Sequence, residues 1–245
     1  MAQPSNTPQG RQPLRLAAHI LGETLLTLGF ILLLFVGWQL WWTNLEANAN
    51  QAQALESFSQ ELPAASPKAP NYDPLNPPVT ASPSYGQVYG AVYIPRLGEN
   101  YARPLAEGVG SDVLDTLGLG HYPQSQNPGQ YGNLALAGHR QTNGAVLDQI
   151  DSLQTGDKIY IRTAEGYYTY TVYQSSIVLP HQVEVIAPNP DQPDQPLEEA
   201  SRRLLTLTSC HPRYGDTERY IVHAEFSSWQ PNQAGPPQEI AHLIP

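Results

Sequence analysis

The chain has 245 residues, of which 40% are hydrophobic and 14% charged, and its 24 prolines are about twice the usual share. Its formal net charge of −10 argues against nucleic acid or an anionic membrane surface as the partner, because either would repel it. The single cysteine excludes an internal disulfide and any zinc or iron–sulfur site built from several cysteines.

The first predicted element is a transmembrane helix, because residues 25–42 (LLTLGFILLLFVGWQLWW) form an apolar run without a charge. As a helix this run spans about 27 Å, roughly the thickness of a hydrocarbon core. Arg11 and Arg15 precede it and only Glu46 and Glu56 follow closely, so we expect the N-terminus inside the cell. A cleaved signal peptide is the alternative, but the run is longer than such peptides have and no small-residue cleavage site follows it.

The composition predicts five segments along the chain. Residues 1–15 are a cytoplasmic tail, and residues 16–42 are a single signal-anchor. Residues 43–86 are an Ala/Gln-rich stalk and a Pro-rich spacer, whose prolines favour a semi-rigid connection over a packed domain. Residues 87–230 are a folded domain, and residues 231–245 are a polar tail that is too short for a second membrane span.

Short alternating segments dominate the folded domain and predict a mainly β structure. The expected strands are 87–98, 132–139, 202–210 and 218–226, with a hairpin over 158–179. The expected short helices are 111–118, with Ser111 as its cap, and 145–153. Closely spaced strands joined mostly by hairpins predict a closed or nearly closed β-barrel of about 140 residues, with small helices in its loops.

The lone cysteine, Cys210, ends a predicted strand at a loop. Most lone cysteines are small buried apolar groups, but outside the cell a free thiol is exposed to oxidation, and loops at strand ends often present catalytic groups. Acyl transfer by a cysteine also needs an acid to protonate the departing amine and a donor to stabilise the oxyanion. His139 at the end of another strand could supply the proton, and Arg213 or Arg219 the positive charge.

Three separated motifs resemble the signature of the sortases, which are membrane-anchored cysteine transpeptidases. They are LAGHR at 136–140, TLTSC at 206–210, and an arginine nine residues after the cysteine. The matching residues are Thr206, Leu207, Cys210, Arg219 and His139. One position departs from the family pattern Thr-Leu-x-Thr-Cys, because Ser209 stands where the family has threonine. Serine keeps the hydroxyl, so we expect function to survive.

The resemblance covers roughly residues 87–227 and implies a sortase-like closed barrel of about eight strands behind one N-terminal transmembrane helix. It implies that Cys210 attacks the Thr–Gly carbonyl of a sorting signal and forms a thioacyl-enzyme. His139 would protonate the leaving amine, and Arg219, which lies where the family's arginine lies, would stabilise the oxyanion or hold the substrate. Arg213 is then a solvated charge. No cofactor is implied, and the scattered acidic residues form no pattern of metal ligands.

The implied partners are secreted proteins with a C-terminal sorting signal and an amine acceptor, such as a lipid-linked peptidoglycan precursor or another protein. The implied location is the bacterial plasma membrane, crossed once, with the catalytic domain on the cell-wall side.

Residues 118–144 and 206–226 look most like class E sortases, which typically cut Leu-Ala-x-Thr-Gly rather than Leu-Pro-x-Thr-Gly. His121 and Tyr122 carry much of this likeness. Tyr122 could contact the second position of the signal, and Thr208 and Ser209 are the other expected substrate-binding residues. Class C enzymes have an Asp-Pro lid, which YDPL at 72–75 only half resembles, so we expect a chance match in a proline-rich linker.

Two rival functions remain open from the residues alone. Cys210 with His139 or His211 could bind a metal, although the sequence nominates no third ligand. Alternatively, the barrel is a non-enzymatic surface scaffold that binds or assembles other proteins, with the cysteine as packing. Alkylation of the thiol would leave a scaffold's function intact.

Overall fold

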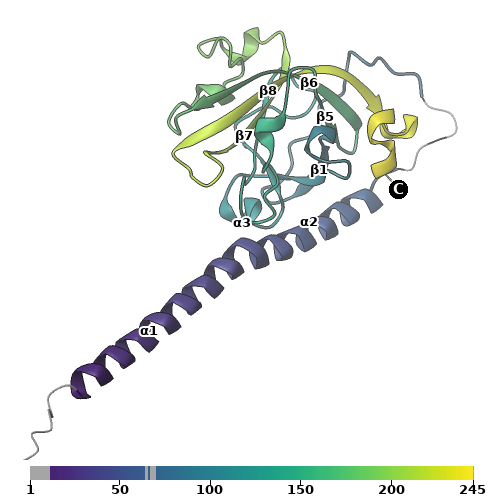
Figure 1. Cartoon of the computed structure of the whole chain (residues 1–245). Coiled ribbons are helices and arrows are strands. Elements are labelled where there is room, and N and C mark those ends of the chain that lie inside the picture. Colours follow the sequence, from purple (N-terminus) through teal and green to yellow (C-terminus); the bar gives the residue numbers. More distant parts are fainter. Residues whose placement is uncertain (1–11, 64–65, 67–69, 245) are drawn as a thin grey trace, which may run out of the picture. The chain divides into compact units, whose positions relative to one another are not determined.

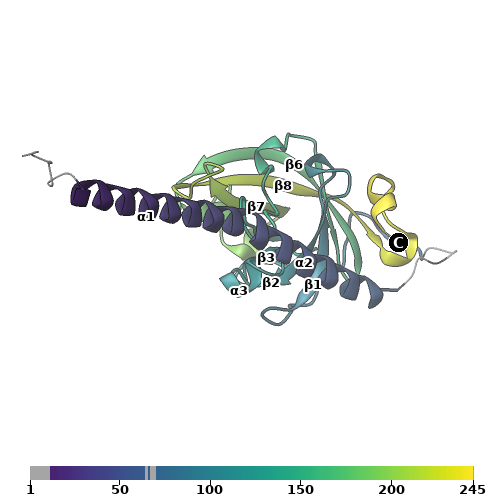
Figure 2. The same cartoon turned by 60° about the horizontal axis from the view of Figure 1, so that its bottom comes forward.

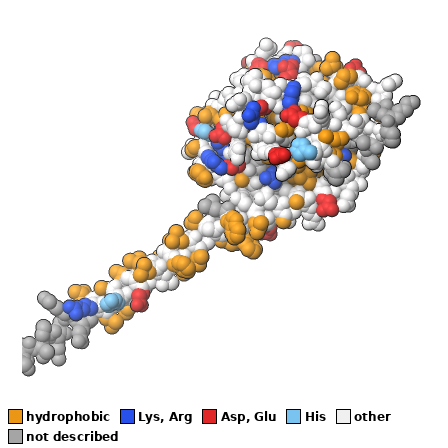
Figure 3. Space-filling view, turned by 45° about the vertical axis from the view of Figure 1, so that its right-hand side comes forward, with side chains coloured by type: hydrophobic (Ala, Val, Ile, Leu, Met, Phe, Trp, Pro, Cys, Tyr) orange, Lys and Arg blue, Asp and Glu red, His pale blue; other side chains and the backbone are white. Residues whose placement is uncertain are grey.

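The computed structural model describes residues 12–63, 66 and 70–244, which form two compact units, Met1–Trp42 and Thr43–Pro245. In the first unit, helix α1 (Gln12–Gly37) is followed by a short π-helical segment, η1 (Trp38–Trp42). Leu14–Gly37 is long and apolar enough to cross a membrane, and no other helix of the described residues is. Hydrophobic side chains cover this helix in Figure 3. The unit is therefore compatible with the expected single span.

The second unit contains helix α2 (Thr43–Gln60), a β-barrel and several short helices (Figure 1). The strands are β1 (Val88–Tyr93), β2 (Ala102–Glu107), β3 (Leu119–His121), β4 (Gly132–Ala137), β5 (Lys158–Arg162), β6 (Gly166–Val178), β7 (Arg203–His211) and β8 (Glu218–Pro231). The short helices are η2 (Pro95–Leu97), α3 (Ser111–Leu114), η3 (Ile150–Ser152), η4 (Val183–Ile186), η5 (Leu197–Glu199), η6 (Asn232–Ala234) and η7 (Gln238–Leu243). Within the described residues, the strands close one barrel in the order β1-β2-β3-β4-β7-β8-β6-β5, which confirms the predicted fold.

Two parallel pairings interrupt an otherwise antiparallel barrel. β2 runs parallel to β3, and β4 runs parallel to β7 with Ala137 opposite Thr208. β7 and β8 form an antiparallel hairpin in which Cys210 faces Arg219. Alternate residues of these strands point into the barrel, and the core includes Leu134, Leu136, Leu205, Leu207, Val222 and Ala224, all of them buried.

Two expected helices differ from the structure. Only Ile150–Ser152 of the segment 145–153 is helical, as a single 3₁₀ turn. Its apolar residues Val146, Leu147, Ile150 and Leu153 are all buried in the barrel core, so their spacing reflects burial of a loop and not a helical face. The helix expected at 111–118 is the shorter α3, and its N-cap is Gly110 because Ser111 is already the first helical residue.

The segments on both sides of the barrel pack on its surface. Figure 2 shows α2 running across β1 and β2, where it buries Ala47, Gln51 and Phe58. Phe58 joins an apolar cluster with Tyr93 and with Ile240 of the C-terminal tail. Prolines of the Pro-rich segment cannot donate backbone hydrogen bonds, but their carbonyl oxygens can accept them. The Trp229 amide donates to the Pro74 carbonyl, and the Tyr168 hydroxyl donates to the Pro78 carbonyl. These flanking residues are therefore part of the folded unit.

The YDPL segment lies far from the single thiol. Tyr72 packs edge-to-face on Trp229, with ring centroids 5.7 Å apart. Trp229 stands on β8 ten residues beyond Arg219, a distance of about 30 Å along a strand. Because Arg219 faces Cys210, the segment does not form a lid over the cysteine.

Candidate active site

One end of the three neighbouring strands β4, β7 and β8 carries the residues His139, Cys210 and Arg219. The parallel register between β4 and β7 places Ala137 opposite Thr208, so His139, two residues on, reaches the level of Cys210. Cys210 and Arg219 are directly opposite each other on β7 and β8, and such pairs have Cβ atoms about 4.5–5.5 Å apart. Cys210 is a free, partly exposed thiol. The three residues picked from the sequence are thus brought together.

The backbone between β4 and β7 is held tightly just before these residues. The Gly138 amide donates to the Thr208 carbonyl at 3.1 Å, and the Ser209 hydroxyl donates to the Gly138 carbonyl at 2.8 Å. A Cβ atom at Gly138 would come within 2.7 Å of the Val146 side chain, so a larger residue there would displace neighbouring core side chains. Ser209 is buried, and its hydroxyl joins the two strands instead of lining the groove described below.

A buried arginine holds the backbone of Cys210 from behind. Arg140 is 2% exposed, and its Nη1 donates to the Cys210 carbonyl at 3.2 Å and to His211 Nδ1 at 2.8 Å. Its Nη2 forms an ion pair with Asp151 at 2.7 Å. Arg140 is the last residue of the LAGHR motif, and no role for it was predicted from the sequence. An arginine directly after an apolar strand is the signal that could have found it.

The histidine next to the thiol does not face it. His211 accepts the hydrogen bond from Arg140, and its ring lies against that of Tyr220 with centroids 5.8 Å apart. This agrees with the expectation that consecutive strand residues point to opposite faces. No group of three or more His, Cys, Asp or Glu side chains in the described part of the chain is arranged to hold a metal ion.

The two candidate arginines occupy different surroundings. Arg219 Nη1 donates to the carbonyls of Asp216 (2.7 Å) and Glu218 (2.8 Å), and its side chain lines a groove beside the cysteine. Arg213 forms an ion pair with Asp148 at 2.5 Å and does not line the groove. Of the two, only Arg219 is therefore available to a peptide lying beside Cys210.

The groove is small and mostly apolar, with a volume of about 100 Å³. Its lining residues are Tyr122, Val178, Leu179, Pro180, Gln182, Val183, Val185, Ile186, Thr208, Arg219 and Ile221. The Tyr122 hydroxyl lies 3.2 Å from Thr208 Oγ1, so two predicted substrate-binding residues meet at this groove. The lining suits an apolar side chain that enters next to the thiol.

A buried hydrogen-bond network around His121 supports the loop that carries Tyr122. His121 Nδ1 lies 2.6 Å from Glu107 Oε2, and its Nε2 lies 2.9 Å from Ser125 Oγ. The Tyr122 amide then donates to the Ala135 carbonyl on β4 at 3.0 Å. Because both His121 and Glu107 are buried, this network fixes the start of the loop that borders the groove.

Helix α2 braces the loop that follows His139. Asn143 and Ala145 have φ angles of 53° and 44°, a left-handed conformation that costs a non-glycine residue about 1–3 kcal/mol. Between them, the Gly144 amide donates to Asn44 Oδ1 at 2.8 Å, and Gln51 Nε2 donates to the Asn143 carbonyl at 3.3 Å. Both partners stand on α2, so this helix holds a strained loop in place.

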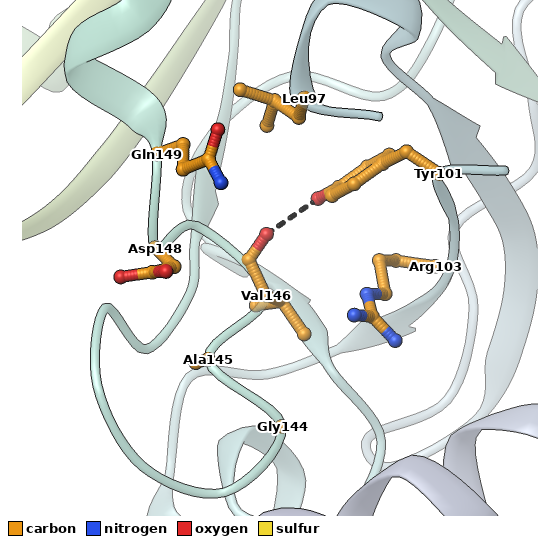
Figure 4. A pocket seen from close by; sticks show the side chains of 8 residues that line it. All are labelled: Leu97, Tyr101, Arg103, Gly144, Ala145, Val146, Asp148 and Gln149. Carbon is orange, nitrogen blue, oxygen red and sulfur yellow. Dashed lines mark hydrogen bonds between the residues drawn. The ribbon is translucent and has the colours of Figure 1, made fainter. Parts of the chain in front are cut away.

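The same loop forms one side of a polar pocket of about 250 Å³, shown in Figure 4. Its lining residues are Leu97, Tyr101, Arg103, Gly144, Ala145, Val146, Asp148 and Gln149. The Tyr101 hydroxyl donates to the Val146 carbonyl across the pocket at 2.7 Å. The loop is thus tied to the β2 side of the barrel as well as to α2.

The imidazole of His139 has one carboxylate partner. Its Nε2 lies 2.6 Å from Asp115 Oδ1, and both side chains are partly exposed. Asp115 caps the C-terminus of α3, which leads into β3 beside β4. Asp115 lies outside the motifs at 136–140 and 206–210, so the sequence alone does not point to it.

Comparison with known proteins identifies close similarity over most of the chain. A family model described as a sortase domain matches residues 92–227. Sortase SrtE1 of Streptomyces coelicolor is 31% identical over 91% of this chain, which spans 61% of the length of that relative. Sortase SrtE2 of the same organism is 29% identical, covering 88% of this chain and 85% of the relative.

Solved structures agree with this similarity. SrtA sortase from Actinomyces oris is 42% identical with a TM-score of 0.63, covering 67% of this chain and 93% of that one. Sortase E from Streptomyces avermitilis is 38% identical with a TM-score of 0.57, covering 64% and 99% respectively.

Proposed function

Since the chain belongs to the sortase family, we propose that it is a cysteine transpeptidase that cleaves a sorting signal between Thr and Gly. The observation that carries this proposal is the convergence of His139, Cys210 and Arg219 at one end of β4, β7 and β8, beside an apolar groove. A nucleophile, an acid and a hydrogen-bond donor are the groups that acyl transfer requires.

The reaction proceeds through a thioester in two steps. Cys210 Sγ attacks the threonine carbonyl carbon, the C–N bond breaks, and His139 gives a proton to the departing glycine amine. An acceptor amine then attacks the thioester carbonyl, the C–S bond breaks to release Cys210, and the amine's proton returns to His139. Arg219, directly opposite the nucleophile, donates hydrogen bonds to the carbonyl oxygen as it becomes negative or to the substrate backbone. Its guanidinium would first leave the two loop carbonyls that it now contacts.

The preferred signal is Leu-Ala-x-Thr-Gly, with Leu-Pro-x-Thr-Gly as the alternative. The similarity to class E relatives supports this preference, and the apolar groove suits the leucine. Tyr122 and Thr208, which meet at the groove, are proposed to contact the residue after leucine.

The partners are secreted proteins that carry such a signal and an amine of the cell wall or of another protein. Helix α1 would anchor the enzyme in the bacterial plasma membrane, with residue 1 inside and the barrel on the cell-wall side. The length and composition of Leu14–Gly37 support this arrangement, as do Arg11 and Arg15 near the N-terminal end of the helix.

The test uses the full chain in detergent with two quenched fluorescent peptides, one for each signal, and a glycine peptide as acceptor. We expect cleavage and transfer that disappear in Cys210→Ala, with faster turnover of the Leu-Ala peptide. Retention of cleavage by Cys210→Ala would refute the proposed mechanism. A folded protein with a reactive thiol that cleaves neither peptide would favour the scaffold function.

A further inference from the structure

Asp115 is well placed to control which nitrogen of His139 is available for chemistry. The distance of 2.6 Å joins its Oδ1 to His139 Nε2. An ionised carboxylate can only accept a hydrogen bond, so Nε2 must carry the proton in this pair. Within the part of the chain that the structure describes, Nδ1 has no hydrogen-bond partner. Nδ1 is therefore the nitrogen left to exchange a proton with a substrate.

The topology explains why an aspartate 24 residues upstream reaches the histidine. β3 is antiparallel to β4, with Gly120 opposite Ala137, so the start of β3 lies beside the residues that follow β4. A Cβ atom at Gly138 would come within 2.8 Å of Leu119, which shows how closely the two segments approach. Asp115 lies four residues before Leu119, at the end of α3, and its own amide is fixed by the Ser111 carbonyl at 2.9 Å.

The other charged groups near this histidine have partners elsewhere. Arg140 is adjacent in sequence, but its guanidinium contacts Asp151 and the Cys210 carbonyl. Asp112 lies in α3, the short helix that Asp115 caps. It accepts a hydrogen bond from the Tyr85 hydroxyl at 2.8 Å and does not contact His139. Asp115 is thus the one carboxylate among the described residues that is hydrogen-bonded to the His139 ring.

We propose that Asp115 is a positioning residue that holds the His139 imidazole with Nε2–H directed at its carboxylate and Nδ1 directed at the leaving amine. Because His139 is the proton donor of the function proposed above, this role rests on that function. Without the carboxylate, the half-exposed ring would rotate or change tautomer, and protonation of the amine would slow. The attack by Cys210 itself does not pass through Asp115.

The experiment separates proton donation from the rest of the reaction by changing the leaving group. The full chain in detergent is given either the Leu-Ala-x-Thr-Gly amide or a 4-nitrophenyl ester of the same Leu-Ala-x-Thr peptide. Nitrophenolate leaves without a proton, whereas the glycine amine needs one. In Asp115→Ala and Asp115→Leu, we expect kcat on the amide to fall about 10- to 100-fold, and the ester rate to change less than about twofold. Asp115→Leu has nearly the shape of aspartate and serves if the alanine variant does not fold.

Asp112→Leu is the matched control, and we expect both rates to stay within about twofold of those of the unmodified chain. Equal losses of amide and ester activity in the Asp115 variants would show a merely structural role and overturn the proposal, as would no loss at all. The variants His139→Ala and Cys210→Ala show whether a negative result concerns only the role of Asp115 or the proposed function as a whole. If Cys210→Ala is inactive and His139→Ala loses the amide reaction selectively while the Asp115 variants do not, only the role of Asp115 fails.

Discussion

The Ser209 hydroxyl donates a hydrogen bond of 2.8 Å to the Gly138 carbonyl and so ties the strand that ends in Cys210 to the segment that leads into His139. Both groups are buried, so water cannot replace the bond if it is lost. Position 209, where serine replaces the family's threonine, thus has a structural role: its hydroxyl group links β7 to the segment after β4.

Ser209→Ala should lower the free energy of unfolding by about 1–2 kcal/mol, because the Gly138 carbonyl loses its side-chain donor in a buried place. It should also reduce transpeptidation, since the spacing between His139 and Cys210 is no longer fixed from both strands. Thermal unfolding in detergent and the fluorescent peptide assay measure the two effects. Ser209→Thr, which restores the family's residue, is the control and should keep activity. Equal activity of the alanine and threonine variants would contradict this account.

Tyr122→Ala should weaken the preference of the protein for Leu-Ala-x-Thr-Gly peptides over Leu-Pro-x-Thr-Gly peptides. Tyr122 borders the groove, where its hydroxyl lies 3.2 Å from Thr208 Oγ1, and its removal widens the groove. We expect the ratio of kcat/KM values for the two peptides to fall by about 10-fold, equivalent to 1.4 kcal/mol. Tyr131→Ala, an exposed tyrosine outside the groove, is the control. An unchanged ratio in Tyr122→Ala would exclude the proposed contact.

The stability of the protein should fall as the pH decreases below about 6.5. Burial lowers the pKa of His223 from its usual 6.5, with Asp191 raising it and Arg202 lowering it. The unfolded chain therefore takes up a proton at a pH where the folded chain does not, so this contribution is present above pH 6.5 and is lost as the pH falls. His223 also lies 2.9 Å from Thr206 Oγ1 and stacks on Tyr173.

The check is the midpoint of thermal unfolding at pH 7.5 and at pH 5.5. The decrease between the two should be smaller in His223→Gln, which does not titrate, than in the unmodified chain. His181→Gln, at an exposed loop position, should leave the decrease unchanged. A decrease of the same size in all three proteins would assign the pH effect to other groups.

Helix α2 should stabilise the loop after His139. Gln51 is 1% exposed, donates to the Asn143 carbonyl and accepts from Arg103 Nη1 at 3.3 Å. Gln51→Ala should therefore lower the free energy of unfolding by about 2 kcal/mol and reduce the turnover of the amide peptide. Gln53→Ala, an exposed glutamine of the same helix, should have neither effect. If Gln51→Ala had the stability and turnover of the unmodified chain, α2 would contribute to neither property through this residue.

Much of the barrel could be predicted because its strands alternate in polarity or are continuously apolar. The strands β4 to β8 follow from such runs, whereas β2 and β3 do not. β2 has the sequence ARPLAE, in which Arg103 and Pro104 break the pattern, and β3 has only three residues. Their positions depend on tertiary pairing, of β2 with β1 and β3 and of β3 with β2 and β4, which the local pattern of these short segments does not encode.

The candidate site was predictable where its residues fall in motifs. Cys210 and Arg219 face each other within one hairpin, so nine residues of sequence suffice to link them. Arg140 lies in a motif, but its role depends on burial behind β7, and Asp115 lies in no motif because its role depends on the antiparallel register of β3 and β4. Charged residues that act through tertiary contacts look like ordinary surface charges in the sequence.

The parallel pairing of β4 with β7 also bears on how the enzyme matures. Cys210 and Arg219 belong to one hairpin, a structure that forms within microseconds, whereas the β4–β7 register joins residues 71 positions apart, as from Ala137 to Thr208. A chain that is still folding can therefore bring its thiol beside the arginine before the histidine has arrived. The candidate site is therefore complete only once the barrel has closed, so a half-folded chain holds the cysteine and the arginine without the histidine.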